Sequence, residues 1–494
     1  MNLSQTAAGY ANRVFGLDLR SLAVMRIGLA SVILADLAIR ASDFSAMYVD
    51  DGIASVEFVR GTFHLPVWSL HLLNGGAGYQ AALFAVAALL TVALLVGYHT
   101  RVATIGCWIM VASIQLRMPP VTNAGDTMLR VFQFWSMFLP LGAVWSLDAR
   151  RRGPPALPLR FVSMGTVAFV VQLAIVYWFA GWAKWNDAWL QEDALGNIFK
   201  FGFYGLPLGA ALADNPEVTR YASRLTVWFE LFGPLLLFVP WQVARCRAIA
   251  IIGFVLLHLG IAVTMTVGLF SYVAVAVWMA MLPTEFWNFV RMREPLLAPT
   301  VAPSSTSNSR RIAAGLCLVS LVIAVYWNVA NEISRRPANI YDAAMRYAAQ
   351  LTTLRQSWGV FGRPPRQDSW FVYQARLKNG EQVDLLSGES EILANKPPLA
   401  SRQFTNHRWR KLHNRLRSES VAAYRQPLAE YMVRRWNAAH APAEQILRLD
   451  FYLYSQAFDR AGNGGEHARK TLAQVIDSEA GGNFAEAIRE DEGF

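Results

Sequence analysis

Three ionisable side chains stand in apolar stretches of the chain, and their types could support proton transfer. Lys184 follows the stretch YWFAGWA, Glu230 lies in WFELFGPLLLF, and His258 lies in VLLHLGI. An amine kept away from water can act as a base, and a nearby carboxylate or imidazole can relay the proton. We therefore name these three as candidate catalytic residues, with Lys184 as the base and Glu230 and His258 as relay or binding groups.

Each candidate also has a purely structural interpretation. Lys184 lies among four tryptophans between residues 178 and 189. We expect these to form an aromatic belt at the outer membrane interface, where a snorkelling lysine can simply anchor a helix end. A single histidine on an apolar helix is more often a hydrogen-bonded core residue than a functional one. For Glu230 the residues alone favour neither interpretation.

Three further charges interrupt apolar stretches: Arg26, Asp36 and Arg130. Ten residues separate Arg26 from Asp36, which is about 15 Å along a helix. They cannot pair with each other, so we expect each to snorkel or to find a partner elsewhere. Arg130 follows Asp126 by four residues, and we predict an ion pair between these two at the outer end of a helix.

The composition indicates which elements must hold these side chains. Hydrophobic residues make up 54% of the 494 residues and charged residues only 16%, with a mean hydropathy of +0.27. Residues 1–331 carry 38 charged side chains, and the remaining 163 residues carry 42. This distribution is typical of a membrane protein with a soluble appendage.

A helix needs about 20 mostly apolar residues to cross a bilayer. We predict an all-α polytopic membrane protein of about nine transmembrane helices with a small C-terminal α+β extramembrane domain. The expected divisions are a helical membrane domain over 1–290, a linker and last transmembrane helix over 291–331, and the C-terminal domain over 332–494. The candidate spans are Ser21–Ile39, Ala77–Val96, Val102–Leu116, Met128–Trp145, Phe161–Trp182, Leu225–Val239, Ala248–Thr266, Phe270–Leu282 and Ile312–Val329.

The arginines that flank these stretches predict the orientation. With a cytoplasmic N-terminus, 13 arginines fall on one side, whereas the loops after the first and fifth spans are acidic or mixed. Positive charge collects on the cytoplasmic side of membrane proteins. We therefore expect a multi-pass protein of the cell inner membrane, with a cytoplasmic N-terminus and linker and an extracytoplasmic C-terminal domain.

The pattern changes after the last span. Residues 370–386 alternate around Asn379-Gly380, which predicts a β-hairpin. Helices are expected at about 406–438, 443–457 and 466–489, where Arg, Ala and Glu are frequent. The basic run Arg408–Arg417 is most simply a solvated helix face, and the alternative is contact with anionic lipid headgroups or an acidic partner.

Other kinds of chemistry lack their signatures. The three cysteines lie in or beside apolar runs without a C-x-x-C pair, and no H-E-x-x-H or G-x-x-x-x-G-K-[ST] motif occurs. No metal is expected. The net charge of +10 is spread over both parts of the chain, so nucleic acid is not expected as a partner.

Several motifs in order resemble a known family. They are MRIGL, LADLAIR and YVDDG near the start, then GYHTR, NAGDTMLRVFQFWSMFLPLG, AGWAKWNDAW, FELFGPLLLF, HLGIAVTMTVGLFSYV and WGVFGRPPR. Together they are similar to the HTTM domain, the membrane part shared by vitamin K-dependent γ-glutamyl carboxylase and many bacterial proteins. The resemblance covers about residues 15–290 well and continues more loosely to about 410.

The resemblance implies a chemistry for Lys184. In the carboxylase, a lysine in an A-G-x-x-K context deprotonates reduced vitamin K on the lumenal side, and Ala180–Lys184 matches that context. A reduced quinone of the vitamin K type is thus implied as cofactor, and the family also places a histidine where His258 falls. The stretch Thr122–Asp126 lacks the histidine that follows paired asparagines in the carboxylase, which puts glutamate carboxylation in doubt.

Three functions remain at this stage. The first is a quinol-dependent enzyme, carboxylase-like in its carbon–carbon bond chemistry, that modifies an exported peptide or protein. The second is a non-catalytic membrane maturation or scaffold protein whose soluble tail contacts an exported polypeptide. A small-molecule carrier is less favoured, because the spans show no inverted repeat.

Overall fold

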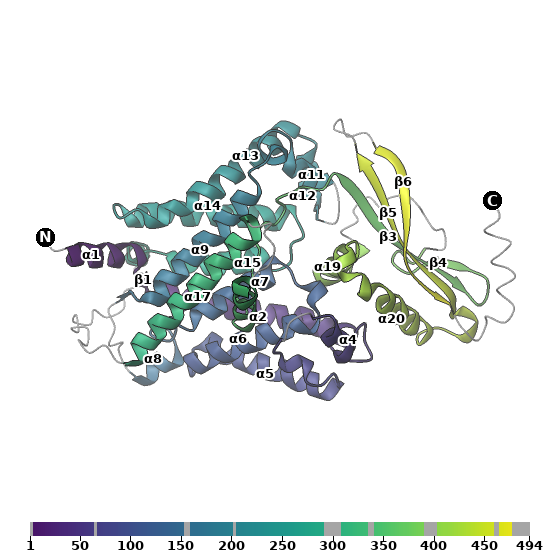
Figure 1. Cartoon of the computed structure of the whole chain (residues 1–494), viewed down its shortest axis with the longest axis horizontal. Helices are drawn as coiled ribbons and strands as arrows, with labels where there is room; N and C mark the ends of the chain where they lie inside the picture. Colours follow the sequence, from purple (N-terminus) through teal and green to yellow (C-terminus); the bar gives the residue numbers. More distant parts are fainter. Residues whose placement is uncertain are drawn as a thin grey trace.

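The computed structural model describes residues 3–63, 67–152, 159–200, 204–290, 308–333, 340–389, 403–458 and 464–476. Figure 1 shows a body of helices that run roughly side by side, and a smaller unit of sheet and helices at one end of it. The N-terminal helix α1 (Leu3–Phe15) lies at the opposite end of that body. The N-terminus and the C-terminal unit are therefore separated by the length of the helical body.

Among the described residues, five helices are long and apolar enough to cross a membrane. They lie on five of the predicted spans, and the presence of several such helices makes this an integral membrane protein. They are α2 (Leu19–Ser42), α5 (Ala77–Val96), α9 (Met164–Ala183), α14 (Val243–Thr264) and α17 (Asn308–Ile333).

The prediction of nine spans is not confirmed within the described residues. The other four predicted spans correspond to α6 (Thr100–Arg117), α7 (Ala124–Ser136), α13 (Pro216–Phe232) and α15 (Phe270–Trp278), which are shorter or more polar. In α13 the reason is local. Pro234 follows Gly233, and the chain continues as the 3₁₀ helix η3 (Gly233–Phe238), because proline lacks the N–H that an α-helix needs.

Short elements connect the long helices. They are β1 (Leu17–Asp18), α3 (Phe44–Met47), α4 (Val56–Gly61), η1 (Leu70–Leu72), η2 (Pro119–Val121), α8 (Leu147–Arg152), β2 (Arg160–Phe161), α10 (Asp187–Leu190), α11 (Ala194–Lys200), α12 (Pro207–Ala213), η4 (Met279–Met281), α16 (Thr284–Phe289) and α18 (Ile340–Leu351). Most of the linker predicted over 291–311 lies outside the described residues.

Arginines from several loops meet at the α1 end of the body. Strands β1 and β2 pair there, and Arg160 donates to the carbonyl of Arg13. Arg247, at the start of α14, donates to the carbonyls of Gly16 and Val14 at 3.0 and 2.7 Å. Loops that the charge pattern assigns to one membrane face thus lie together, while the face they occupy remains a prediction.

The C-terminal unit contains a four-stranded antiparallel sheet in the order β4-β3-β5-β6. Its strands are β3 (Gln367–Leu377), β4 (Gln382–Asp384), β5 (Ile446–Phe458) and β6 (Gly464–Ile476). The predicted hairpin at Asn379-Gly380 joins β3 to β4, and Gly380 has the positive φ of 91° that such a turn needs. The remaining elements are α19 (His407–Leu416), η6 (Glu419–Tyr424), α20 (Arg425–Asn437) and η7 (Pro442–Glu444).

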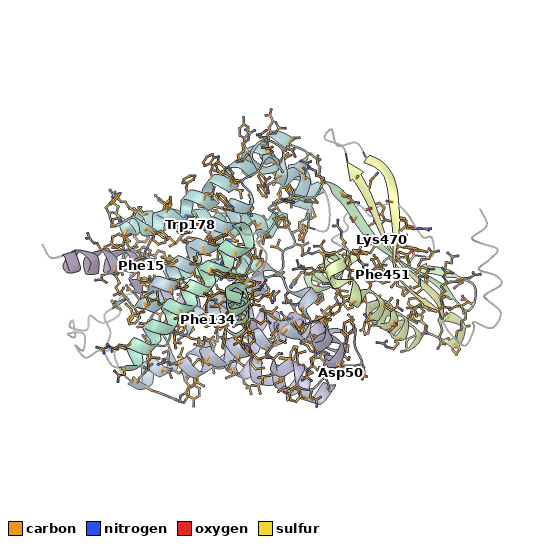
Figure 2. All side chains as sticks on the ribbon, in the orientation of Figure 1. Phe15, Asp50, Phe134, Trp178, Phe451 and Lys470 are labelled. Carbon is orange, nitrogen blue, oxygen red and sulfur yellow. The ribbon has the colours of Figure 1, made fainter. Side chains whose placement is uncertain are left out.

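The helices predicted at 443–457 and 466–489 are wrong where the structure describes them. Residues 446–458 form β5, in which Leu449 and Phe451 join the main core, whereas Tyr452 and Tyr454 pack with Trp370 in a separate cluster. Figure 2 shows Phe451 within the C-terminal unit. Strand β6 has a helix-like composition but pairs along β5. Pairing and burial in the sheet override the local propensity.

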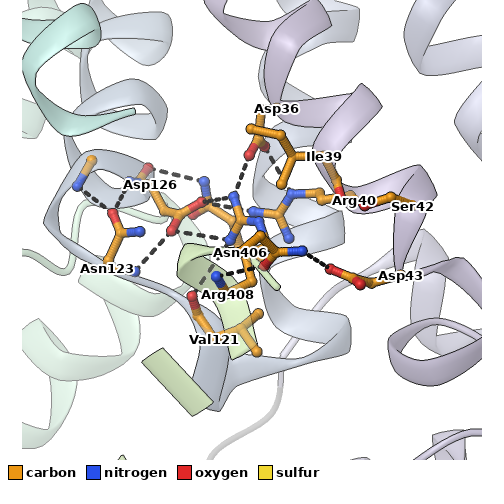
Figure 3. Close-up of polar contacts among 12 residues, drawn as sticks. Asp36, Ile39, Arg40, Ser42, Asp43, Val121, Asn123, Asp126, Asn406 and Arg408 are labelled. Carbon is orange, nitrogen blue, oxygen red and sulfur yellow. Dashed lines mark hydrogen bonds and ion pairs between the residues drawn. The ribbon is translucent and has the colours of Figure 1, made fainter. Parts of the chain in front are cut away.

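The basic run in α19 is largely buried, so its interpretation as a solvated face is wrong for Arg408. This side chain is 1% exposed and reaches between α2 and α7 (Figure 3). It pairs with Asp36, and with Asp126 at 3.0 Å. Arg40 joins the same acids at 2.8 and 2.7 Å. This four-residue cluster fastens the C-terminal unit to the helical body.

The predicted ion pair between Asp126 and Arg130 is absent from the described contacts, because Asp126 faces Arg40 and Arg408 instead. Arg130 donates to the Gln115 side chain at 2.5 Å and to the carbonyl of Thr353 at 2.9 Å. Arg26 and Asp36 on α2 each find a partner elsewhere in the protein, as expected. Asp36 belongs to the cluster above, and Arg26 donates to the carbonyls of Leu141 and Trp145 at 3.2 and 2.6 Å.

Candidate functional site

Helix α9 places Lys184 at the end of the helical body nearest the C-terminal unit. Ser163 begins the helix with a capping box that includes Thr166, which satisfies free backbone N–H groups at that end. Lys184 is the C-cap residue. Just beyond it, Asn186 donates to the carbonyl of Gly362 and Trp189 to that of Phe361, both at 2.9 Å. The segment that follows the lysine is thereby fixed.

Gly181 lets α13 approach α9 closely. A Cβ atom at position 181 would lie 2.9 Å from Cγ of Leu231 and 3.2 Å from Cβ of Glu230. Both distances are shorter than ordinary van der Waals contact, so a larger residue would push α13 away. One helical turn after Gly181, the approach brings the side chain of Lys184 to Glu230.

Lys184 and Glu230 form a buried ion pair. The Nζ atom of Lys184 lies 2.8 Å from Oε2 of Glu230 and donates to the carbonyl of Ala180 at 3.2 Å. The two residues are 5% and 7% exposed, and the ammonium lies 5.4 Å from the centre of the Trp189 ring. Lys184 is therefore an internal cation with a carboxylate partner and does not snorkel, and Trp189 lies inside the protein and not in a belt.

His258 belongs to a second polar group, formed with Tyr177 and Trp278. The Nε2 atom of His258 lies 2.8 Å from the Tyr177 hydroxyl, and Nε1 of Trp278 donates to the same hydroxyl at 2.7 Å. Because the indole can only donate, the arrangement that satisfies all three has Tyr177 donating to Nε2. The proton of the neutral imidazole is then on Nδ1, which has no hydrogen-bond partner among the described residues.

Lys184 and Glu230, together with Tyr177 and His258 of the second group, line one cavity of about 920 Å³. The cavity lies between α9, α13 and α14 of the body and is closed on another side by α19 and by residues 355–361. A volume of roughly 300–1,000 Å³ is typical of small-molecule and cofactor pockets. Sequence reasoning selected Lys184, Glu230 and His258 separately, and the structure brings all three to this cavity, the first two in direct contact.

The lining fits a flat apolar ring that carries polar oxygens. Aromatic and aliphatic side chains supply most of the wall, among them Trp189, Phe270 and Trp358. The Lys184–Glu230 pair and His258 supply two separate polar parts of the wall. A reduced quinone has this combination of ring and hydroxyl groups, so the residues present are compatible with one.

Sequence reasoning missed two parts of the cavity wall. Tyr177 lies seven residues before Lys184, which is two helical turns on one face of α9, and that spacing could have indicated it. The basic residues Arg410, Lys411 and Arg415 also line the cavity. Nothing local in the sequence places them there, because their position depends on how the C-terminal unit docks.

The comparison with family models gives one match. A model described as the HTTM domain matches residues 16–287. No curated protein and no solved structure matches the chain. The matched range contains Lys184, Glu230 and His258 and ends before α17, so the C-terminal unit lies outside it.

Proposed function

The chain belongs to the HTTM domain family, and from this premise we propose that it is a membrane enzyme that uses a reduced quinone of the vitamin K type to modify an exported peptide. The observation that carries the proposal is the buried Lys184–Glu230 pair, with its 2.8 Å contact, on the wall of a 920 Å³ cavity. A lysine at the lipid-facing rim would instead have favoured a scaffold.

The pair can take up one proton as a unit. When bound, a reduced quinone supplies two electrons and an acidic hydroxyl group. The Lys184 ammonium can pass its proton across the 2.8 Å contact to Glu230 and so become a free amine. The amine then accepts the hydroxyl proton, which leaves a protonated Glu230, a charged Lys184 and one additional positive charge on the pair. Lys184 and Glu230 would thus hold the transferred proton and present a positive charge to the oxygen of a quinol bound beside them.

His258 has a positioning role in this proposal. Tyr177 and Trp278 hold its ring by hydrogen bonds of 2.8 and 2.7 Å. This arrangement leaves Nδ1–H free to donate to an oxygen at the far side of a bound ring. One ring oxygen at the ion pair and one at His258 would fix the ring between α9 and α14.

The test is quinol consumption by purified protein. We expect protein in detergent, supplied with menaquinol, oxygen and candidate peptides, to oxidise the quinol faster than protein-free solution. Lys184→Ala should abolish this activity. Lys184→Arg should also abolish it although the positive charge is kept, because a guanidinium does not deprotonate. Lys470→Ala is the matched control, since Lys470 is an exposed lysine of the C-terminal unit. No consumption by the wild type, or equal consumption by Lys184→Ala, contradicts the proposal.

The second candidate is the non-catalytic scaffold, and the position of β6 favours it. Strand β6 forms one edge of the sheet, and no described strand pairs with its outer side. An exposed edge can bind an extended polypeptide through backbone hydrogen bonds. Crosslinking of an exported peptide to β6 that persists in Lys184→Ala protein without any quinol consumption would support this function.

A further inference from the structure

Helix α19 presents three cations to the cavity: Arg410, Lys411 and Arg415. None of them forms an ion pair with a described residue, whereas Arg408 on the same helix pairs with both Asp36 and Asp126. Asp126, the acid of the helical body that acts on Lys411, is already shared between Arg40 and Arg408. The cavity mouth therefore carries three positive charges without matching carboxylates.

Arg410 is the most informative of the three. It is only 3% exposed, yet its Nε and Nη1 atoms have no hydrogen-bond partner among the described residues. Its guanidinium lies 4.5 Å from the centre of the Tyr204 ring, which holds it in place. A buried guanidinium with unused donors is costly unless an acceptor completes it. Its planar donors suit an oxyanion.

The cavity also has an exposed apolar side. Its wall includes Val218 on α13 and Leu256 on α14, which are 53% and 62% exposed. Beside them, a Cβ atom at Gly260 would meet nothing within 4 Å. An acyl chain can therefore run along this side while a headgroup remains at α19.

We propose that Arg410, Lys411 and Arg415 form a binding site for the phosphate of an anionic phospholipid whose acyl chain lies against α13 and α14. This site lies on the α19 side of the cavity that the Lys184–Glu230 pair also lines, and it does not depend on quinol chemistry. Phosphate fits three clustered cations, and basic clusters beside a membrane surface attract anionic lipid. The bound headgroup accepts hydrogen bonds from the unpartnered Nε and Nη1 atoms of Arg410 and covers the mouth of the cavity.

The test measures equilibrium binding of short-chain lipids to full-length protein in detergent, without quinol or oxygen. We expect dioctanoyl phosphatidylglycerol to bind at least tenfold more tightly than dioctanoyl phosphatidylcholine or inorganic phosphate. Arg410→Gln should weaken phosphatidylglycerol binding about tenfold or more. Arg435→Gln is the matched control, because Arg435 is exposed on α20 of the same unit, and it should leave the affinity unchanged.

A second variant keeps the proposal testable if Arg410→Gln fails to fold. Arg415 is exposed, so Arg415→Gln should fold normally and weaken binding about threefold. An unchanged affinity in Arg415→Gln, together with an unchanged affinity or no fold in Arg410→Gln, overturns the proposal. Equal binding of the two lipids also overturns it. If inorganic phosphate binds as tightly as phosphatidylglycerol, the acyl chain contributes nothing and the lipid assignment is wrong.

The site should also depend on pH. Burial, with Arg415 and Arg410 adding repulsion and Asp126 opposing it, lowers the pKa of Lys411 to about 8. The cation is present below that pH and lost above it, so phosphatidylglycerol affinity should fall as the pH rises from 7 to 9. Lys411→Gln should remove most of this dependence. An identical pH profile in that variant would contradict the role of Lys411.

Discussion

Lys184 and Glu230 stabilise each other inside the protein, where either charge would be unfavourable without its partner. Loss of one partner leaves a buried, unpaired charge, which costs roughly 3–5 kcal/mol. We therefore expect Glu230→Gln to lower the free energy of unfolding by that amount, as measured by thermal or denaturant unfolding in detergent. The 2.8 Å contact makes this coupling direct.

A double-mutant cycle separates this structural role from the chemical one. Lys184→Met with Glu230→Leu replaces both charges by apolar groups of similar size, so it should recover most of the stability lost in either single variant. The same double variant should remain unable to consume quinol. If the two single effects simply add, Lys184 and Glu230 are not coupled and the pair described above does not exist in solution.

The sequence indicated these two residues but not their contact. Each stood out because a charge in an apolar helix is costly, and that argument needs no partner. The pairing joins positions 46 residues apart, and it depends on how α13 crosses α9. The prediction for Arg130 was wrong for the same reason. Its spacing from Asp126 predicted an ion pair, but Asp126 pairs with Arg40 and Arg408, which come from other parts of the chain.

At the scale of elements, Gly181 sets the distance between α9 and α13. Gly181→Val should separate the helices, because its Cβ would meet Leu231 at 2.9 Å before the larger side chain is even placed. We expect a loss of about 1–3 kcal/mol in stability and a larger proportional loss of quinol consumption. Gly315→Val is the control, since a Cβ there meets nothing within 4 Å on α17. Equal effects of the two substitutions would contradict the role of Gly181.

Helix α19 is held to the sheet by His413, and this contact should make the C-terminal unit sensitive to acid. Nε2 of His413 lies 2.8 Å from the Tyr373 hydroxyl, and burial lowers the pKa of His413 to about 4. Between pH 6.5 and 4 the unfolded chain binds a proton that the folded unit does not. Stability therefore falls as the pH falls through that range, by up to about 3 kcal/mol.

Hydrogen exchange of the β3 and β5 amides measures this dependence locally. We expect protection to decrease from pH 6.5 to pH 4 after correction for the intrinsic exchange rate. His413→Gln should flatten the profile, because the glutamine does not titrate. A wild-type profile that stays flat over this range would show that His413 does not control the stability of the unit.

Helices and turns with a strong local sequence signal were predicted correctly, whereas strands that form through pairing with distant residues were not. The five long apolar helices and the hairpin at Asn379-Gly380 follow from local signals that nothing opposes. Strands β5 and β6 were both predicted as helices. The Ala, Arg and Lys content of β6 suits a helix until its pairing with β5 is known. The aromatic residues of β5, which include Phe451, Tyr452 and Tyr454, are typical of a strand, and the prediction overlooked them. The segments that contain η3 and α15 were likewise predicted as continuous spans. Length and hydropathy do not show that the α-helix ends early in each of them.

At the scale of the whole molecule, the two parts are fastened by the cluster of Asp36, Arg40, Asp126 and Arg408 (Figure 3). Arg408→Gln leaves two acids against one arginine in a buried setting. We expect undocking of the C-terminal unit, seen as faster proteolysis and faster hydrogen exchange in α19. Arg435→Gln, an exposed change on α20, should have neither effect. Unaltered proteolysis in Arg408→Gln would contradict the fastening role.

Orientation is the second prediction at this scale. The arginine-rich loops gather at the α1 end of the body, and the C-terminal unit lies at the other end (Figure 1). We expect alkaline phosphatase fused after Asn331 to be active outside the cytoplasm, and a fluorescent protein fused there to stay dark when exported. The reverse pattern would place the cavity on the cytoplasmic side and remove the link to exported peptides.

The cavity wall is shared between two stretches of sequence, and only one of them lies within the family match. The pair at Lys184 and Glu230 falls in residues 16–287, whereas Arg410, Lys411 and Arg415 fall outside that range. An identical helical body joined to a different C-terminal unit would keep the Lys184–Glu230 pair but lose the three cations of α19. Exchange of the C-terminal unit can thus change which ligands enter the cavity, while Lys184 and Glu230 stay the same.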